Sequence, residues 1–171
     1  MKIFIAIPAY DRKICVETAR SLINEHSVAL TIGIELIVSF VPGCSLITHA
    51  RNQAVRDFLN SDCDRLVFID SDVAWEPGSI ISLASHDKDF VGGAYRYKDD
   101  EENYPVAYLD KPELWADPET GLIEVSMLPA GFLALKREVF TKLTERYPER
   151  AYSFHGQAFQ GFFHCPPGDG E

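Results

Sequence analysis

The stretch Arg65-Leu66-Val67-Phe68-Ile69-Asp70-Ser71-Asp72 carries most of the information about the fold of this chain. Its apolar core has the length of a buried strand and ends abruptly in two aspartates separated by one residue. Similar apolar runs precede it at residues 2–7 and 35–41, and segments with helical spacing lie at 12–24 and 47–60. Strands that alternate with helices are typical of parallel sheets with right-handed crossover connections. We therefore expect an α/β fold with a mostly parallel central sheet.

The alternation continues downstream of the two aspartates. The sequence predicts a helix that begins near Pro77 and ends near residue 85, because proline is favoured in the first helical turn. From Tyr152 onward no regular periodicity is visible. No repeat or composition shift divides the chain, so residues 1–171 are expected to form one domain. The other expected elements are strands at 89–94, 122–128 and 132–136, an acidic loop at 99–104 and a helix at 137–146.

Composition narrows the class of protein. With 171 residues, of which 46% are hydrophobic and 25% charged, the chain has enough apolar material for one ordinary core. Its formal net charge of −10 argues against a nucleic-acid partner, since such binding relies on lysine and arginine. The apolar start, up to Pro8, is too short for a signal peptide or a membrane span, so a cytoplasmic location is expected. The cysteines form no C-x-x-C pair, which is typical of incidental thiols; they are Cys15, Cys44, Cys63 and Cys165.

The D-x-D motif formed by Asp70, Ser71 and Asp72 is the sharpest chemical feature. Ligands of parallel α/β sheets gather at the carboxyl ends of the strands, which is where these residues are expected. Two carboxylates on a short turn suit Mg²⁺ or Mn²⁺, which would bridge the phosphates of a nucleotide. The alternative is a solvated turn whose aspartates cap the following segment. The tripeptide alone does not decide between them.

Further motifs occur in the order found in GT-A glycosyltransferases, and the chain resembles the family 2-like phage and bacterial members across residues 3–147. The resemblance implies the GT-A fold, a Rossmann-like α/β/α sandwich, and transfer of a sugar from a nucleoside diphosphate sugar to an unknown acceptor. UDP-sugar is the first expectation for the donor, with Mn²⁺ or Mg²⁺ held by Asp70 and Asp72. Apart from the aspartate motif, the matching segments are Ile7-Pro8-Ala9-Tyr10, His49-Ala50-Arg51-Asn52-Gln53-Ala54, Val91-Gly92-Gly93-Ala94-Tyr95-Arg96-Tyr97-Lys98 and Ala130-Gly131-Phe132-Leu133-Ala134-Leu135-Lys136-Arg137-Glu138-Val139-Phe140.

The residues expected at the donor site come from four of these segments. Tyr10 could stack on the base, while Pro8 would stiffen its loop. Arg51 could contact the nucleotide or an aspartate, although a plain structural ion pair is an equal alternative. The complete expected set is Pro8, Tyr10, Arg51, Asp70, Ser71, Asp72, Gly93, Tyr95 and Gly131.

Two glycines and an aromatic residue in that set have competing explanations. Gly93 and Gly131 indicate close backbone approach, either to a ligand or to a neighbouring element. Tyr95 could form a platform for the sugar, but aromatic residues beside a strand are more often core.

The sequence departs from the family pattern at two places. Residues 38–41 lack the acidic side chains that contact the base in typical members. The family's Glu-Asp pair, whose Asp is the general base, would begin where this chain ends, so Asp169 or Glu171 could serve as the base or the base could be absent. We therefore expect donor binding with poor transfer. His155 and His164 could reach the metal, although loop histidines are more often solvated.

Two other functions compete. In a haloacid-dehalogenase-like phosphatase, Asp70 would be the nucleophile and Asp72 the acid/base. Against this, Ala74 stands where that motif expects Thr or Val, and the motif follows the third expected strand rather than the first. A non-catalytic module that binds a nucleotide or a carbohydrate is the other alternative, because the motifs above concern donor binding.

Overall fold

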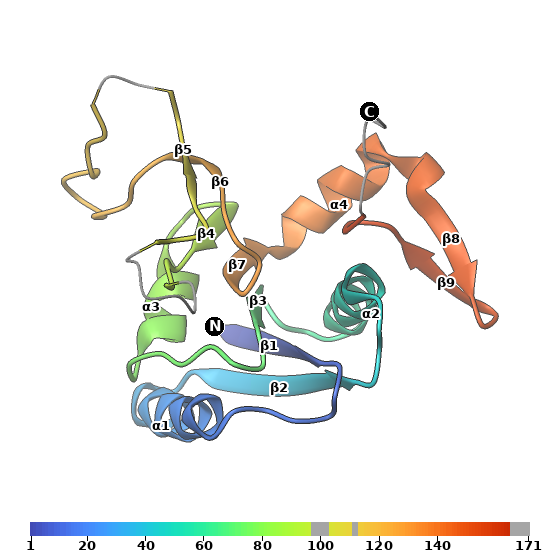
Figure 1. Cartoon of the computed structure of the whole chain (residues 1–171), viewed down its shortest axis with the longest axis horizontal. Helices are drawn as coiled ribbons and strands as arrows, with labels where there is room; N and C mark the ends of the chain where they lie inside the picture. The colour runs from blue at the N-terminus through green and yellow to red at the C-terminus, as the bar shows by residue number, and fades with distance from the viewer. Residues whose placement is uncertain (97–102, 111–112, 165–171) are drawn as a thin grey trace.

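A mixed five-stranded sheet forms the centre of the computed structural model, which describes residues 1–96, 103–110 and 113–164 (Figure 1). The strand order is β2-β1-β3-β7-β4, and β1 pairs in parallel with both β2 and β3. Only β7 runs the other way, antiparallel to β3 and β4. The expected α/β fold with a mostly parallel sheet is confirmed. The strands are β1 (Lys2–Ala9), β2 (Glu35–Pro42), β3 (Arg65–Ile69), β4 (Phe90–Gly92) and β7 (Phe132–Lys136).

Four helices cover the two faces of this sheet. Because successive strand residues point to opposite faces, Ile3 and Ile5 of β1 pack into one core cluster while Phe4 and Ala6 pack into the other. Helices α1 (Val16–Ile32) and α3 (Ser79–Ser85) contribute to the first cluster. Helices α2 (Ile47–Leu59) and α4 (Arg137–Arg146) contribute to the second. The result is a three-layered α/β/α arrangement.

The bounds predicted for the first helix were wrong. The helix was expected at 12–24, but α1 spans Val16–Ile32 and ends at Gly33, which adopts a left-handed φ of 70°. Its inner face is largely polar, since the buried residues are Thr18, Ser21, Glu25 and Ala29. Three of these four side chains are polar, so periodicity of hydrophobic residues underestimates the length of the helix.

A second, two-stranded sheet lies outside the main one. It pairs β5 (Ala107–Tyr108) with β6 (Val125–Met127) in antiparallel register. The strand expected at 122–128 is therefore shorter than predicted, and β5 was not expected. The strand expected at 89–94 is likewise reduced to β4, Phe90–Gly92.

The third sheet is a hairpin that sequence periodicity missed. After a short 3₁₀ helix (Pro148–Arg150), strands β8 (Ala151–Phe154) and β9 (Gln157–Gln160) pair antiparallel. Their two-residue turn has positive φ at both positions, 49° at His155 and 74° at Gly156, as a type I′ turn requires. The hairpin packs along α2, where the Arg56 guanidinium lies 4.5 Å from the centroid of the Phe159 ring (Figure 1).

Within the described part of the chain, none of the helices has the length and apolar character needed to cross a membrane.

Candidate functional site

The D-x-D turn lies at the carboxyl end of β3, as expected, and its backbone is held from two sides. On one side, the Asp70 amide donates a hydrogen bond to the Gly131 carbonyl over 3.0 Å. On the other, the Ser71 carbonyl accepts from the Cys15 amide at 2.9 Å and the Thr18 hydroxyl at 3.2 Å. The turn therefore connects β3, the segment before β7 and the beginning of α1.

The exit from this turn is held by the polar inner face of α1. The Ser21 hydroxyl donates to the Trp75 carbonyl at 2.8 Å and accepts from the Trp75 amide at 3.0 Å. The fully buried carboxylate of Glu25 accepts hydrogen bonds from Trp75 Nε1 and from the amides of Gly78 and Ile81, over 2.8 to 3.1 Å. Trp75 also stacks on Phe132, with ring centroids 6.0 Å apart. Trp75 is therefore part of the packing that supports the turn.

Arg51 of α2 forms an ion pair with the first aspartate. Its Nη2 atom lies 3.1 Å from Asp70 Oδ1, and the two side chains are 17% and 34% exposed. The predicted contact between Arg51 and an aspartate is thus present. The Arg51 Nε atom is buried and has no hydrogen-bond partner among the described residues.

Gly131 makes room for the other oxygen of this carboxylate. A Cβ atom at Gly131 would lie 2.4 Å from Asp70 Oδ2 and 2.4 Å from the Tyr95 hydroxyl. Real Cβ atoms do not come so close to other heavy atoms, so a side chain at this position would displace both groups. The close approach predicted at Gly131 is therefore an approach of Asp70 and Tyr95 to the backbone.

Tyr95 is a neutral phenol beside these charges. Partial burial raises the pKa of its hydroxyl above the ordinary value of 10.0, and the negative charge of Asp70 raises that pKa further. The hydroxyl consequently keeps its proton at neutral pH and can donate it in a hydrogen bond. Tyr95 also packs against the first core cluster, so both interpretations of this residue hold in part.

The remaining expected residues are spread around the turn. Pro8 is buried near the end of β1, and Tyr10 follows it in the loop with 69% of its surface exposed. A Cβ atom at Gly93 would lie 2.1 Å from the Phe132 ring, so packing of that ring alone accounts for this glycine. The expected bases Asp169 and Glu171 lie outside the described residues.

The metal-binding potential of the site rests on Asp70 and Asp72. No group of three or more histidine, cysteine or acidic side chains suited to a metal ion exists in residues 1–96, 103–110 and 113–164. Neither His155 nor His164 therefore completes such a group with the aspartates. Two carboxylates still fit Mg²⁺ or Mn²⁺, because these ions usually keep several waters and take further oxygen ligands from substrate phosphates.

Comparisons with known proteins support the fold and do not specify a function. No protein-family model and no curated protein matches the chain. Its structure is similar to the crystal structure of A197 from STIV, with a TM-score of 0.54 and 23% sequence identity over 83% of this chain and 68% of that one. At this level of identity the likeness shows a shared fold alone.

A cavity of about 410 Å³ beside the first half of α2 was not predicted. The residues that build it include His49 and Asn52 of α2 and Tyr152 of β8. The spacing of His49 and Asn52, three residues apart at the start of a predicted helix, places both side chains on one face. That spacing was the sequence signal from which the cavity residues on α2 could have been found. Tyr152 could not be found in the same way, because its hairpin was not predicted.

Proposed function

We propose that this protein is a metal-dependent glycosyltransferase of the GT-A type that binds a nucleoside diphosphate sugar at the carboxyl ends of β1 and β3. The observation that carries the proposal is the arrangement of Asp70. Its carboxylate is held by Arg51 on one side and occupies the space left by Gly131 on the other. A carboxylate held by these contacts has a restricted orientation, which favours binding of a cation at the turn.

The order of the sheet supports the same proposal. The turn follows a parallel strand at the centre of the sheet, next to the loop after β1, and parallel α/β sheets bind ligands at this edge. Exposed Tyr10 in that loop offers a ring for stacking on a base. The motif order described above supplies the link to nucleotide sugars, because neither the fold nor the likeness to A197 specifies a ligand.

The roles follow from the chemistry of the side chains. Asp72 and Asp70 would hold Mn²⁺ or Mg²⁺, and when bound the cation would neutralise charge on the departing diphosphate. The ion pair with Arg51 orients the Asp70 carboxylate. The Tyr95 hydroxyl could donate a hydrogen bond to an oxygen atom of a donor bound beside Asp70. A general base is not assigned, since Asp169 and Glu171 lie outside the described residues.

The test is a thermal-shift titration with UDP in the presence and absence of Mn²⁺. At a concentration about one hundred times the dissociation constant, binding should stabilise the folded protein by roughly 2.7 kcal/mol. We expect the shift with Mn²⁺ and not with EDTA, and we expect Asp72→Asn to abolish it without loss of the fold. Asp57→Asn, which removes a carboxylate paired with Arg56 on α2, is the matched control and should keep the shift. Equal shifts with EDTA would contradict the metal bridge.

The non-catalytic alternative shares the donor site and differs in what happens to the donor. A binding module would show the metal-dependent shift but leave a nucleotide sugar intact. Release of free UDP from UDP-sugar, lost in Asp72→Asn, separates the transferase from the module.

A further inference from the structure

The cavity beside α2 has a charge that is unusual for this molecule. It lies between the first half of α2 and the segment from the 3₁₀ helix to residue 164. Although the chain has a net charge of −10, the described lining contains an arginine and two histidines and no acidic side chain. The polar lining residues are Thr48, His49, Asn52, Arg150, Tyr152 and His164.

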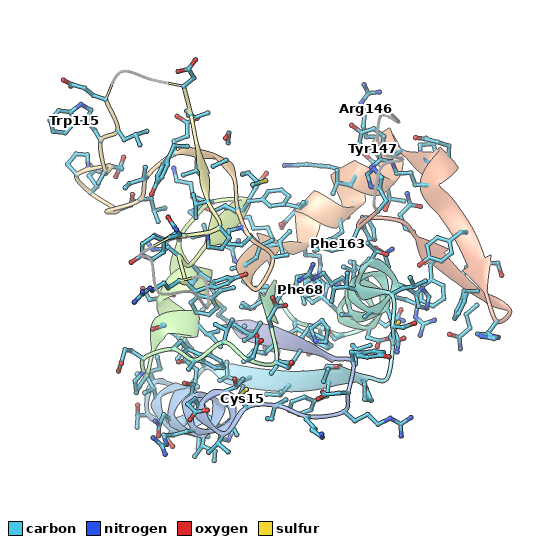
Figure 2. The ribbon with its side chains drawn as sticks, in the orientation of Figure 1. Cys15, Phe68, Trp115, Arg146, Tyr147 and Phe163 are labelled. Carbon is cyan, nitrogen blue, oxygen red and sulfur yellow. The ribbon has the colours of Figure 1, made fainter. Side chains whose placement is uncertain are left out.

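One wall of the cavity is built by Asn52, whose surface is only 4% exposed. Its side-chain amide donates to the Phe163 carbonyl at 3.1 Å, and its carbonyl oxygen accepts from the Phe163 amide at 2.9 Å. The Phe163 ring packs edge-on against Phe68 of β3, with centroids 5.2 Å apart (Figure 2). These contacts hold the chain at Phe163, next to His164, which also lines the cavity.

On the same face of α2, His49 is also held in place. His49 Nδ1 and the Tyr152 hydroxyl are 2.9 Å apart, and the Asn52 amide donates to the same hydroxyl oxygen at 3.4 Å. The Tyr152 hydroxyl therefore links His49 and Asn52, which fixes the position of the His49 ring. The His49 ring is also packed against Phe154 and Phe159, with centroids 4.3 and 4.9 Å away.

Arg150 adds a positive charge whose donors stay available. Its guanidinium lies over the Tyr147 ring at 4.1 Å, a contact that engages the face of the group and leaves its N–H edges able to donate. Arg146, at the end of α4 and labelled beside Tyr147 in Figure 2, also lies over the Tyr147 ring, at 5.6 Å. It is not among the residues that line the cavity. The two arginines therefore differ in access to the cavity and share the same aromatic partner.

The cavity and the D-x-D turn share a wall. Arg51 and Asn52 are consecutive on α2: the first contacts Asp70, while the second holds Phe163. The Arg51 guanidinium is 5.9 Å from the centroid of the Phe163 ring. A molecule in the cavity would therefore lie next to a donor bound at the turn.

We propose that this cavity is the acceptor site and that the acceptor presents an anionic group, a carboxylate or a phosphate, to Arg150, His49 and His164. The identification as an acceptor site rests on the proposed transferase function. The anion specificity rests on the lining itself, which offers several donors and no described carboxylate. A volume of about 410 Å³ is that of a site for a small molecule, such as one sugar unit with its charged substituent.

The experiment is an NMR titration of the full chain with glucuronate, glucose 6-phosphate and neutral methyl glucoside, without nucleotide or metal. The readout is the ring ¹H–¹⁵N correlations of His49 and His164. We expect an acidic probe to shift both histidines at concentrations where methyl glucoside does not. A response to glucuronate alone or to glucose 6-phosphate alone identifies the anion as carboxylate or phosphate.

Variants make the result specific. Arg150→Gln should weaken binding of the acidic probe roughly tenfold, a factor that corresponds to about 1.4 kcal/mol. Arg146→Gln is the matched control and should leave it unchanged. Thermal unfolding of both variants checks that the fold is intact. The ring ¹H–¹⁵N correlation of His155, in the hairpin turn, serves as an internal reference.

Two results would overturn the anion site: no shift of His49 and His164 with either acidic probe, or equal affinity for the neutral glucoside. Failure of the transferase proposal looks different. In that case the acidic probe binds and Arg150→Gln weakens it, but UDP with Mn²⁺ gives no thermal shift. If the cavity is the acceptor site, the acidic probe should accelerate release of UDP from UDP-sugar in the wild-type protein and not in Arg150→Gln. Equal acceleration in both proteins would overturn the acceptor role.

Discussion

The missing side chain at Gly131 lets oxygen atoms from two other segments meet beside β7. A Cβ atom at this position would lie only 2.4 Å from Asp70 Oδ2 and 2.4 Å from the Tyr95 hydroxyl. A methyl group at this position would therefore lower the free energy of unfolding and also displace Asp70, the proposed metal ligand.

We predict that Gly131→Ala lowers stability and weakens metal-dependent UDP binding together. Overpacking of this kind costs about 1–3 kcal/mol, and Asp70 must leave Arg51 or rotate to relieve it. Urea unfolding and the thermal-shift titration with UDP and Mn²⁺ measure the two effects. Gly92→Ala is the control, because its Cβ would press on Leu128 at 2.7 Å and not on Asp70. Equal loss of UDP binding in both variants would mean that Gly131 acts through stability alone.

Cys63 gives a prediction about pH. Its side chain is 1% exposed, and burial raises the pKa of the thiol above its ordinary value of 9.0. The folded state thus favours the protonated thiol. The stability that this contributes is complete below the ordinary pKa and is lost as the pH rises through the folded pKa. We expect Cys63→Ala to lose less stability than wild type when unfolding is compared at pH 8 and pH 10.

Thiol labelling provides an independent check of the same burial. In the native protein at pH 8, exposed Cys15 should react with a thiol reagent while Cys63 reacts only after unfolding. Reaction of Cys63 at the rate of Cys15 would show that its site opens readily.

At the scale of elements, α1 supports the D-x-D turn through polar contacts. Its inner face carries Thr18, Ser21 and Glu25, and each forms a hydrogen bond with the segment that follows β3.

Helix α4 is also attached to the rest of the molecule through a polar side chain. The Arg137 guanidinium donates to the carbonyls of Phe58, Leu59, Ser61 and Cys63 at the end of α2. Arg137 therefore has a structural role in the motif that joins β7 to α4.

We predict that Glu25→Gln destabilises the protein by about 1–3 kcal/mol, because a neutral amide replaces a buried carboxylate that accepts three hydrogen bonds. One of its two acceptor oxygens becomes an NH₂ group facing backbone amides. Urea unfolding measures the loss. Glu17→Gln, on the exposed side of the same helix, should change stability by less than about 0.5 kcal/mol. A loss of similar size in Glu17→Gln would point to helix propensity and not to the buried contacts.

At the scale of the whole molecule, the position of the D-x-D motif favours the proposed transferase over the phosphatase. It follows the third strand along the chain, and its first aspartate is already paired with Arg51. We predict no turnover of an aryl phosphate with Mg²⁺ and no beryllium fluoride adduct at Asp70, because a phosphatase of that class uses the first aspartate as its nucleophile and carries the motif after the first strand. Turnover that disappears in Asp70→Asn would favour the phosphatase instead.

The main sheet and its helices follow from the sequence because their signals are local. An apolar run such as Leu66 to Ile69 reports its own burial, and proline or glycine marks where elements begin and end. The position of the D-x-D turn at a strand end follows in the same way. Strand order and the antiparallel direction of β7 do not, since they depend on which distant strands pair.

The candidate site likewise has features that the sequence predicts and features that only the tertiary structure shows. Asp70, Arg51 and Gly131 could be selected from the sequence as residue types in motifs, but only the tertiary structure shows that they touch. The length of α1, the hairpin of β8 and β9, and the cavity around His49 were missed. In each case polar or aromatic side chains meet partners dozens of residues away, 50 for Glu25 with Trp75 and 103 for His49 with Tyr152. Hydrophobic periodicity reports which face of an element is buried, whereas hydrogen bonds between distant segments exist only after the chain has folded.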